Sequence, residues 1–442
     1  MSNFKIMLSK RHSNINTLVF IYYLSLTLFV YHFGELFLVE SIVFDLGRFI
    51  WGFLLTLPSI AIMNMSKDNK QVSLSSLFFA FQIILVYIPS IIFVVCQPSF
   101  SFLINFFLLA CMYLMFVLVY FTTRIFGYNV NSKVNDMLVK WIILTLLFIW
   151  FSISLVTAAQ MFVRNGISFE RMFDLDLIYI FRSEVFNSYK TSEFISLYGL
   201  AYFFLPLLIL FSINSKNWGI FILTTLLNLG LFSLTGMKTY FLLPFLTTII
   251  FYLMKGKSEY YFIKMIFIFI LFLLVISFAI SIYLESNYPP ALFLRSTFEA
   301  ARLHVVWIDY FFDKDKVPFW VLNPSGHPNN PGLGWDQIIA EHLGWSIGNG
   351  EGANTGFFAS SYSVYGVVGL LLHIILFSLI LGYLNAKFFL EKNSWVPAAC
   401  IPVMFLLTNI SFVGAILYYG LGLTILATYS LDALFSIRIK LR

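Results

Sequence analysis

Apolar stretches recur along the whole chain and are separated by shorter polar segments. Many of them reach about 20 residues, the length that an α-helix needs to cross the hydrocarbon core of a bilayer. The pattern predicts an all-α polytopic integral membrane protein in which residues 1–442 form a single transmembrane domain, with no soluble domain and no tandem repeat. About twelve spans are expected, at residues 17–38, 46–65, 74–97, 102–122, 139–163, 194–213, 217–235, 239–254, 263–284, 356–386, 394–411 and 413–435.

Composition supports the same class of protein. The chain is 60% hydrophobic and 11% charged, whereas soluble domains contain about 25% charged residues. Cys96, Cys111 and Cys400 all lie inside apolar stretches, so neither a disulfide framework nor a cysteine metal motif is expected. The basic N-terminal segment precedes an apolar stretch that is too long for a signal peptide, which predicts a retained first helix.

The charges set the orientation of the predicted spans. With both termini placed in the cytoplasm, most of the 27 Lys and Arg residues fall in inner loops and most of the 21 Asp and Glu residues in outer loops, as the positive-inside rule requires. Residues 164–193 and 285–355 then form two large outer loops. The net charge of +6 is spread over many short loops, so no nucleic-acid partner is expected.

The larger loop contains charges at helical spacing. "FLRSTFEAARLHVVWIDYFF", residues 293–312, predicts an amphipathic helix whose charged face carries Arg295, Glu299, Arg302 and Asp309. Two interpretations remain open. The charges form a self-paired stripe on a helix at the membrane surface, or the two arginines bind a diphosphate, because guanidinium groups match phosphate oxygens.

The same loop continues into a turn-rich segment, "NPSGHPNNPGLG", at residues 323–334. His327 lies in its middle and is the candidate general base, although a loop histidine is more often simply solvated. His304, His342 and Glu351 are alternatives. Four tryptophans of this loop suit either anchoring at the membrane surface or stacking on sugar rings, namely Trp307, Trp320, Trp335 and Trp345.

Further candidate residues lie outside the larger loop. The smaller loop combines Arg164, Arg171 and Arg182 with acidic and aromatic residues, and its "DLD" at 174–176 is too common a pattern to predict a metal site. Lys238, in "SLTGMKTYFLLP", lies at an outer turn between apolar spans. A lysine there needs an ion-pair partner or a functional role, unless its side chain extends to the membrane interface.

Residues 348–377, "GNGEGANTGFFASSYSVYGVVGLLLHIILF", lead from a glycine-rich segment into an apolar span. Glycines permit tight folding or a close approach to a ligand, but a flexible lead-in to a helix explains them equally simply. The chain lacks the GxxxxGKS/T, GxSxG and HExxH motifs. The signatures of an ATPase, a common serine hydrolase and a common zinc protease are therefore missing.

This layout resembles the bacterial O-antigen and capsule polymerase (Wzy-type) family, which is related to the O-antigen ligases. "TGMKTYFLLP" is similar to the family's Gly-small-Arg turn, with Lys238 in the place of the usual Arg. "GANTGFFASSYSVYGVVGLLL" is similar to the segment that ends the family's large loop, through Asn354, Gly366 and Gly369. The ligases have a histidine where this chain has Ala353.

The resemblance implies a glycosyltransferase of the plasma membrane that polymerises undecaprenyl-diphosphate-linked oligosaccharides into O-antigen, capsule or exopolysaccharide, with a flippase and a chain-length regulator as partners. No cofactor is expected, because the donor stores the energy. Arg295 and Arg302 would stabilise the leaving diphosphate and His327 would act as base. Additional substrate contacts are expected from Lys238, Asn354, Glu351, Arg164, Arg171 and Trp335. The alternatives are a lipid-oligosaccharide flippase or other secondary transporter, and a membrane sugar acyltransferase.

Overall fold

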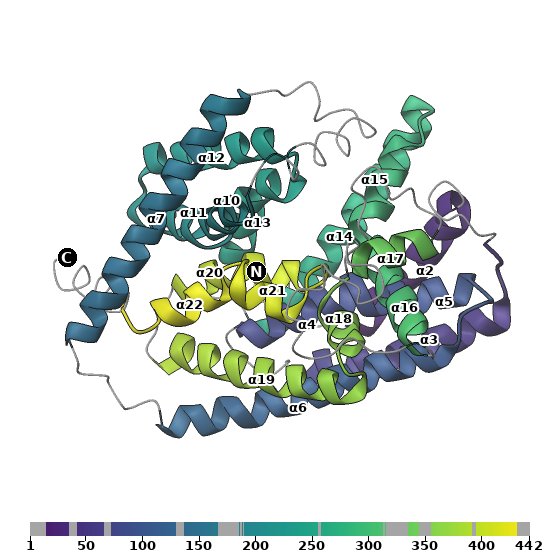
Figure 1. Ribbon diagram of the computed structural model, residues 1–442. Helices are drawn as coiled ribbons and strands as arrows, with labels where there is room; N and C mark the ends of the chain where they lie inside the picture. The colour runs from purple at the N-terminus through teal and green to yellow at the C-terminus, as the bar shows by residue number, and fades with distance from the viewer. Residues whose placement is uncertain are drawn as a thin grey trace, which may run out of the picture. The chain divides into compact units, whose positions relative to one another are not determined.

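In the computed structural model, the residues that can be described form helices joined by turns (Figure 1). These residues are 15–34, 42–65, 72–129, 137–166, 185, 188, 190–254, 258–312, 314, 335–343, 355–390 and 395–430.

Nine spans within these ranges are long and apolar enough to cross a membrane, which confirms a polytopic, all-helical membrane protein. Eight of the nine coincide with spans predicted from the sequence. The ninth, Val367–Phe389, covers only the later part of the predicted span 356–386, whose start forms a separate short helix, Phe357–Ser363. The nine spans are Ile15–Phe33, Leu46–Asn64, Leu74–Cys96, Phe102–Gly127, Leu138–Arg164, Ser192–Ser215, Trp218–Thr235, Glu259–Leu284 and Val367–Phe389.

The other three predicted spans are shorter or broken. Helices α13 (Lys238–Met254) and α20 (Trp395–Leu406) have 17 and 12 residues. In place of a continuous helix over 413–435, the structure has α21 (Phe412–Leu417) and α22 (Leu421–Ala427). Between these two lies Gly420 at a φ of 92°, a left-handed conformation that favours glycine. The total of twelve crossings stays a prediction.

Contacts within the chain gather into two compact units. The first unit comprises residues 1–116 and 253–309, and the second comprises residues 117–252 and 310–442. Helix α6 (Phe102–Asn129) contributes its first half to one unit and its second half to the other.

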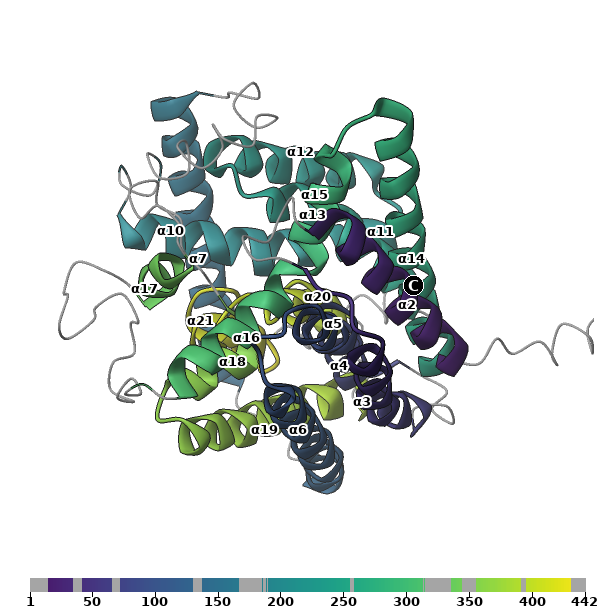
Figure 2. The same ribbon diagram turned by 90° about the vertical axis from the view of Figure 1, so that its right-hand side faces the viewer.

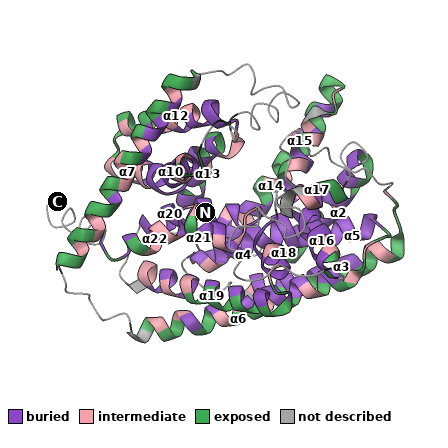
Figure 3. Cartoon of the chain, viewed as in Figure 1, coloured by how far each residue is buried: buried purple, intermediate pink, exposed green. Residues whose placement is uncertain are grey.

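One interrupted helix forms the centre of the first unit. It consists of α4 (Leu74–Gln82), a π-helical turn η2 (Ile83–Tyr87) and α5 (Ile88–Cys96). The span is apolar on all sides, and its most hydrophobic window is completely buried (Figure 3). Around it pack α2 (Ile15–Phe33), α3 (Leu46–Met65) and α14 (Glu259–Leu284), of which α2 and α3 lie beside α5 in both views (Figures 1 and 2).

Arg48 closes the end of this central helix. Its Nη2 atom donates to the carbonyl oxygen of Val94 at 2.7 Å and lies 3.3 Å from those of Gln97 and Phe100. These carbonyls belong to the last turn of α5 and the loop after it, where the helix itself supplies no partner. The arginine therefore has a structural task at the start of α3.

The second unit is also built around an interrupted helix, formed by α10 (Thr191–Gly199), the π-helical turn η3 (Leu200–Phe204) and α11 (Leu205–Ser215). Helices α7 (Met137–Asn165), α12 (Trp218–Thr235), α20 and α22 pack against it. A hairpin of α18 (Phe357–Ser363) and α19 (Val367–Leu390) completes this unit, with α18 against α21 and α19 against α20.

Candidate functional site

The charged segment of the larger loop forms two helices, not one. Helix α15 (Tyr288–Thr297) ends before Phe298, and α16 (Glu299–Phe312) starts directly after it. Every residue from Ala300 to Ile308 is buried. The segment 293–312 is therefore not one continuous helix as predicted, and α16 is a core helix over most of its length.

Contacts with the central helix of the first unit account for this burial. The Ser90 hydroxyl lies 3.3 Å from the Ala301 carbonyl oxygen, and the ring of Phe298 lies 6.0 Å from that of Phe93. Small residues at 300 and 301 let the backbone of α16 come close to its neighbours, as small residues commonly do between helices in membranes.

Arg302 and Glu299 form an ion pair on α16. Nη1 of Arg302 lies 3.6 Å from Oε2 of Glu299, and their side chains are only 5% and 16% exposed. Burial raises the pKa of the Glu299 carboxyl, while the positive charges of Arg302 and Arg295 oppose that rise. The structure thus brings these three residues into one electrostatic cluster, as their spacing predicted. It keeps the cluster out of water, which the sequence did not predict.

His304 lies on the same helix and is completely buried. Its Nδ1 is 2.7 Å from the Ala300 carbonyl oxygen, a bond that Nδ1–H must donate, so Nε2 keeps its lone pair. Nε2 has no hydrogen-bond partner within the described parts of the chain. Burial lowers the pKa of His304 to about 4, so the ring is neutral near pH 7.

The histidine and the ion pair lie on different sides of α16. Two residues along an α-helix turn the side-chain direction by about 200°, which separates His304 widely from Arg302. Sequence reasoning had left His304 as an alternative base. Its fixed ring and free nitrogen depend on tertiary burial, which no local pattern indicates.

Lys238 begins α13 in the second unit and is half-buried. Next to it, the Thr239 hydroxyl lies 3.0 Å from that of Tyr202, and the Tyr240 ring is 5.3 Å from the Tyr202 ring. Tyr198 and Tyr419 stack on each other with centroids 4.8 Å apart. Four tyrosines from three segments therefore meet beside Lys238, and the sequence did not indicate this cluster because the three segments are far apart along the chain.

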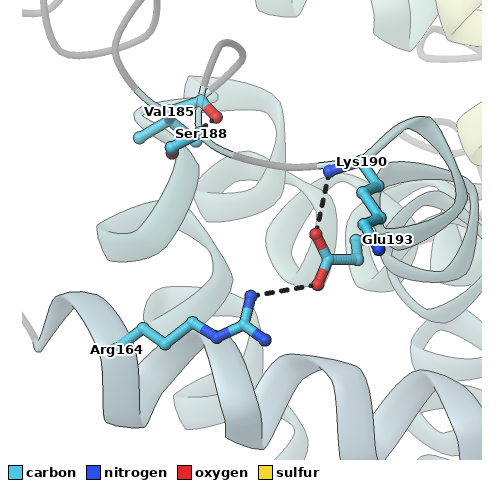
Figure 4. Close-up of polar contacts among 5 residues, drawn as sticks. All are labelled: Arg164, Val185, Ser188, Lys190 and Glu193. Carbon is cyan, nitrogen blue, oxygen red and sulfur yellow. Dashed lines mark hydrogen bonds and ion pairs between the residues drawn. The ribbon is translucent and has the colours of Figure 1, made fainter.

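Arg164 lies at the end of α7 and pairs with Glu193 in the first turn of α10 (Figure 4). Its Nη1 atom is 3.2 Å from Oε1 of Glu193, whose Oε2 accepts the Lys190 backbone N–H at 2.9 Å. The Arg164 side chain is 56% exposed, and exposed pairs of this kind contribute about 0–1 kcal/mol. The geometry assigns Arg164 to joining the two ends of the smaller loop.

The hairpin of α18 and α19 explains two glycines of the sequence motif. Tyr365 and Gly366 have φ values of 58° and 61°, so the chain turns through two successive left-handed residues. A Cβ at Gly369 would collide with the Val364 carbonyl oxygen. Gly366 and Gly369 thus serve a tight turn, while Gly356 only precedes α18.

Several predicted site residues lie outside the described ranges, namely Arg171, His327, Glu351 and Asn354. Trp335 begins α17 (Trp335–His342), and the ring of His342 lies 5.1 Å from that of Tyr310. Trp307 is buried. The predicted roles of these residues stay predictions.

Metal-ligating side chains do not converge within the described ranges, where no group of three or more His, Cys, Asp or Glu residues could hold an ion. All three cysteines are free and buried. Comparison of the chain with protein-family models, with curated proteins and with solved structures finds no match.

Proposed function

We propose that the protein polymerises undecaprenyl-diphosphate-linked oligosaccharide repeat units at the outer face of the bacterial plasma membrane. The growing chain leaves its lipid diphosphate and joins a sugar hydroxyl of the next lipid-linked unit. The bond from the anomeric carbon to the diphosphate oxygen breaks, and a bond to the acceptor oxygen forms. The acceptor's proton passes to a base, and the lipid diphosphate departs as an anion.

The observation that best supports this proposal is the burial of Arg302 and Glu299 on α16 with Arg295 close by. Ionisable groups withheld from water next to a membrane are costly, and where they persist they commonly mark a functional site. A cationic group in a site of low polarity stabilises a departing diphosphate far more than it would in water. Arg295 and Arg302 are therefore the proposed diphosphate ligands.

The base is proposed among the histidines. His327 is the first choice because of its place in the turn-rich outer loop. His304 is a second choice because its neutral ring keeps a bare Nε2. Lys238, Trp335, Asn354, Glu351 and Arg171 remain proposed substrate contacts.

The proposed orientation can be tested by thiol labelling of intact cells. Ser188→Cys, at an exposed position of the smaller loop, is expected to react with a membrane-impermeant maleimide. Asn214→Cys, at an exposed position in the last turn of α11, is the matched inner control and is expected to react only after lysis. The native cysteines are buried and should add little background. The reverse labelling pattern would show that the orientation is inverted.

The activity is tested by the lipid-linked glycans of a deletion strain, analysed by mass spectrometry. Loss of the protein is expected to remove long polysaccharide and to leave single repeat units on lipid at the outer face. The wild-type gene should restore long chains. If long chains persist in the deletion strain, the proposed polymerase activity is wrong.

A lipid-oligosaccharide flippase is the second candidate, because transporters commonly contain helices broken at corresponding positions, and both compact units are built around such a helix. The same experiment separates the two functions, since a flippase mutant accumulates its repeat units at the inner face. A sugar acyltransferase would leave chain length unchanged and alter only the acyl groups.

A further inference from the structure

The central helices of the two units have the same internal construction. In the first unit, nine α-helical residues, 74–82, precede a five-residue π turn, 83–87, and a second α-helix starts at 88. In the second unit, the corresponding segments are 191–199 and 200–204, with the next helix starting at 205. Each boundary is shifted by 117 residues, since 191 − 74, 200 − 83 and 205 − 88 all equal 117.

The starts of these helices also correspond. Ser76 accepts the backbone N–H of Ser73 at 2.9 Å, and Glu193 accepts that of Lys190 at 2.9 Å. In both cases the third helical residue caps the residue before the helix. The pairs 73 and 190, and 76 and 193, again differ by 117.

A proline at the same place explains the two π turns. Pro89 and Pro206 each lie in the second position of the helix that follows the turn. Proline has no N–H, and its ring would collide with the carbonyl four residues earlier, so the chain widens by one residue. The N–H before each proline bonds five residues back, Ile88 to Ile83 and Leu205 to Leu200.

The two interrupted spans are the most buried of the nine candidate spans, at 100% and 72% of their apolar windows. Interrupted helices at corresponding positions of internal repeats are typical of membrane transporters, where they line the binding site.

A buried polar side-chain atom without a hydrogen-bond partner among the described residues belongs to the residue before the first π turn, and another lies next to the residue before the second. In the first copy this residue is Gln82, which is completely buried, and neither its Oε1 nor its Nε2 has a hydrogen-bond partner among the described residues. An unpartnered amide inside a membrane protein is costly. The chain nevertheless places one at the last residue before the turn.

In the second copy, the unpartnered polar atom next to the π turn belongs to a residue of another helix, Trp150. Gly199 stands where Gln82 stands in the first copy, and a Cβ there would lie 2.6 Å from Nε1 of Trp150. The indole N–H therefore occupies space that a side chain at 199 would need. This Nε1 is buried and also lacks a partner within the described ranges. In the second copy, the polar atom next to the residue before the π turn thus comes from Trp150 on another helix.

Proline also leaves a backbone carbonyl of each π turn without a helical N–H partner. In the register of the π turn, the Ile84 carbonyl would pair with the N–H that Pro89 lacks, and the Tyr22 hydroxyl donates to that carbonyl at 2.8 Å instead. The residue that matches Ile84 in the second copy is Ala201, whose carbonyl likewise loses the N–H that Pro206 lacks. Polar groups freed by proline in a membrane helix are commonly satisfied by side chains or ordered water.

We propose that α4–η2–α5 and α10–η3–α11 are two copies of an internal repeat, and that each binds one water molecule at its π turn. Gln82 holds the water in the first copy and Trp150, against Gly199, in the second. Water-mediated hydrogen bonds exchange more readily than the backbone hydrogen bonds of an α-helix. Each π turn therefore acts as a hinge at which its helix bends. This inference does not depend on the proposed enzymatic activity.

The direct test is a density map of the full-length protein in lipid nanodiscs by electron cryomicroscopy, at a resolution that shows ordered water. A peak is expected within hydrogen-bond distance of the Gln82 amide and another next to Trp150 Nε1. A peak in only one copy would overturn the equivalence of the two turns. Density at neither, or a larger guest such as a sugar or lipid at either, would overturn the water assignment.

The sign of a stability change provides an independent test. Gln82→Met removes the polar atoms while nearly keeping the shape of the side chain. Trp150→Phe removes the indole N–H together with part of the ring, so a lowered Tm is informative only for Gln82→Met, while a raised Tm is informative for both. If the Gln82 amide binds water, Gln82→Met should lower the Tm, by about 1 °C for a loss of one hydrogen bond in a protein of this size. If the atoms are unpartnered, removing them should raise the Tm, because their desolvation cost disappears.

Matched controls use the same exchanges at exposed positions. Gln160→Met and Trp218→Phe should leave the Tm unchanged, since Gln160 is exposed and Trp218 is 68% exposed. A raised Tm in either test variant, with silent controls, would contradict the proposal. All four variants are measured in the full-length protein in the same lipid.

Discussion

Arg302→Lys is expected to lower polymer synthesis by about 10²-fold or more while the protein stays folded, if Arg302 stabilises the departing diphosphate. Lysine keeps the positive charge beside Glu299, so the buried ion pair can re-form. It lacks the planar donors with which arginine binds two phosphate oxygens at once. Polymer length on gels and the Tm of the purified protein are the two measurements. Arg295→Lys is expected to act in the same direction.

Two further variants separate catalysis from stability. Arg302→Met removes one partner of a buried pair, which costs up to about 3–5 kcal/mol. Because burial already raises the pKa of Glu299, that carboxyl can take up a proton and reduce the cost. Adding Glu299→Met should therefore recover stability but not activity. Arg124→Lys, at an exposed arginine, is the silent control. Full polymer from both Arg302→Lys and Arg295→Lys would exclude the diphosphate role.

Gly369→Ala is expected to prevent the second unit from folding or to destabilise it by about 3 kcal/mol or more. The added methyl group would collide with the Val364 carbonyl oxygen and approach the Ser361 carbonyl oxygen to 3.2 Å. Both obstacles are backbone atoms, so no side-chain movement removes them. Expression level and Tm measure the effect.

Gly127→Ala is the matched control for the destabilisation expected from Gly369→Ala. Gly127 lies in the last turns of α6, and a Cβ there would meet nothing within 4 Å. Alanine should be neutral or stabilising at this position, by up to about 1 kcal/mol, because it has the higher helix propensity. If Gly369→Ala behaved like Gly127→Ala, the hairpin of α18 and α19 would not have the tight turn described above.

The sequence alone determined where the chain is helical and where it is apolar enough to cross a bilayer. A continuous apolar run of sufficient length has few alternatives to a transmembrane helix, because backbone polar groups in lipid must bond within the chain. The same rule explains why the nine candidate spans overlap apolar stretches that were predicted to cross the membrane. It fails for residues 413–435, because non-helical backbone at Gly420 is tolerated where protein surrounds it.

The local spacing of Arg295, Glu299 and Arg302 also followed from the sequence, since neighbours on a helix are set by its period. The burial of α16 follows only from the tertiary structure, because the sequence pattern of a charged helix face does not depend on whether water or another helix covers it. The equivalence of the two π turns was hidden for a similar reason. Beside those turns, Gln82 in one copy and Trp150 in the other supply the donor from unrelated sequence positions. The contact between Trp150 and Gly199 joins residues that are far apart along the chain, so only the folded structure reveals it.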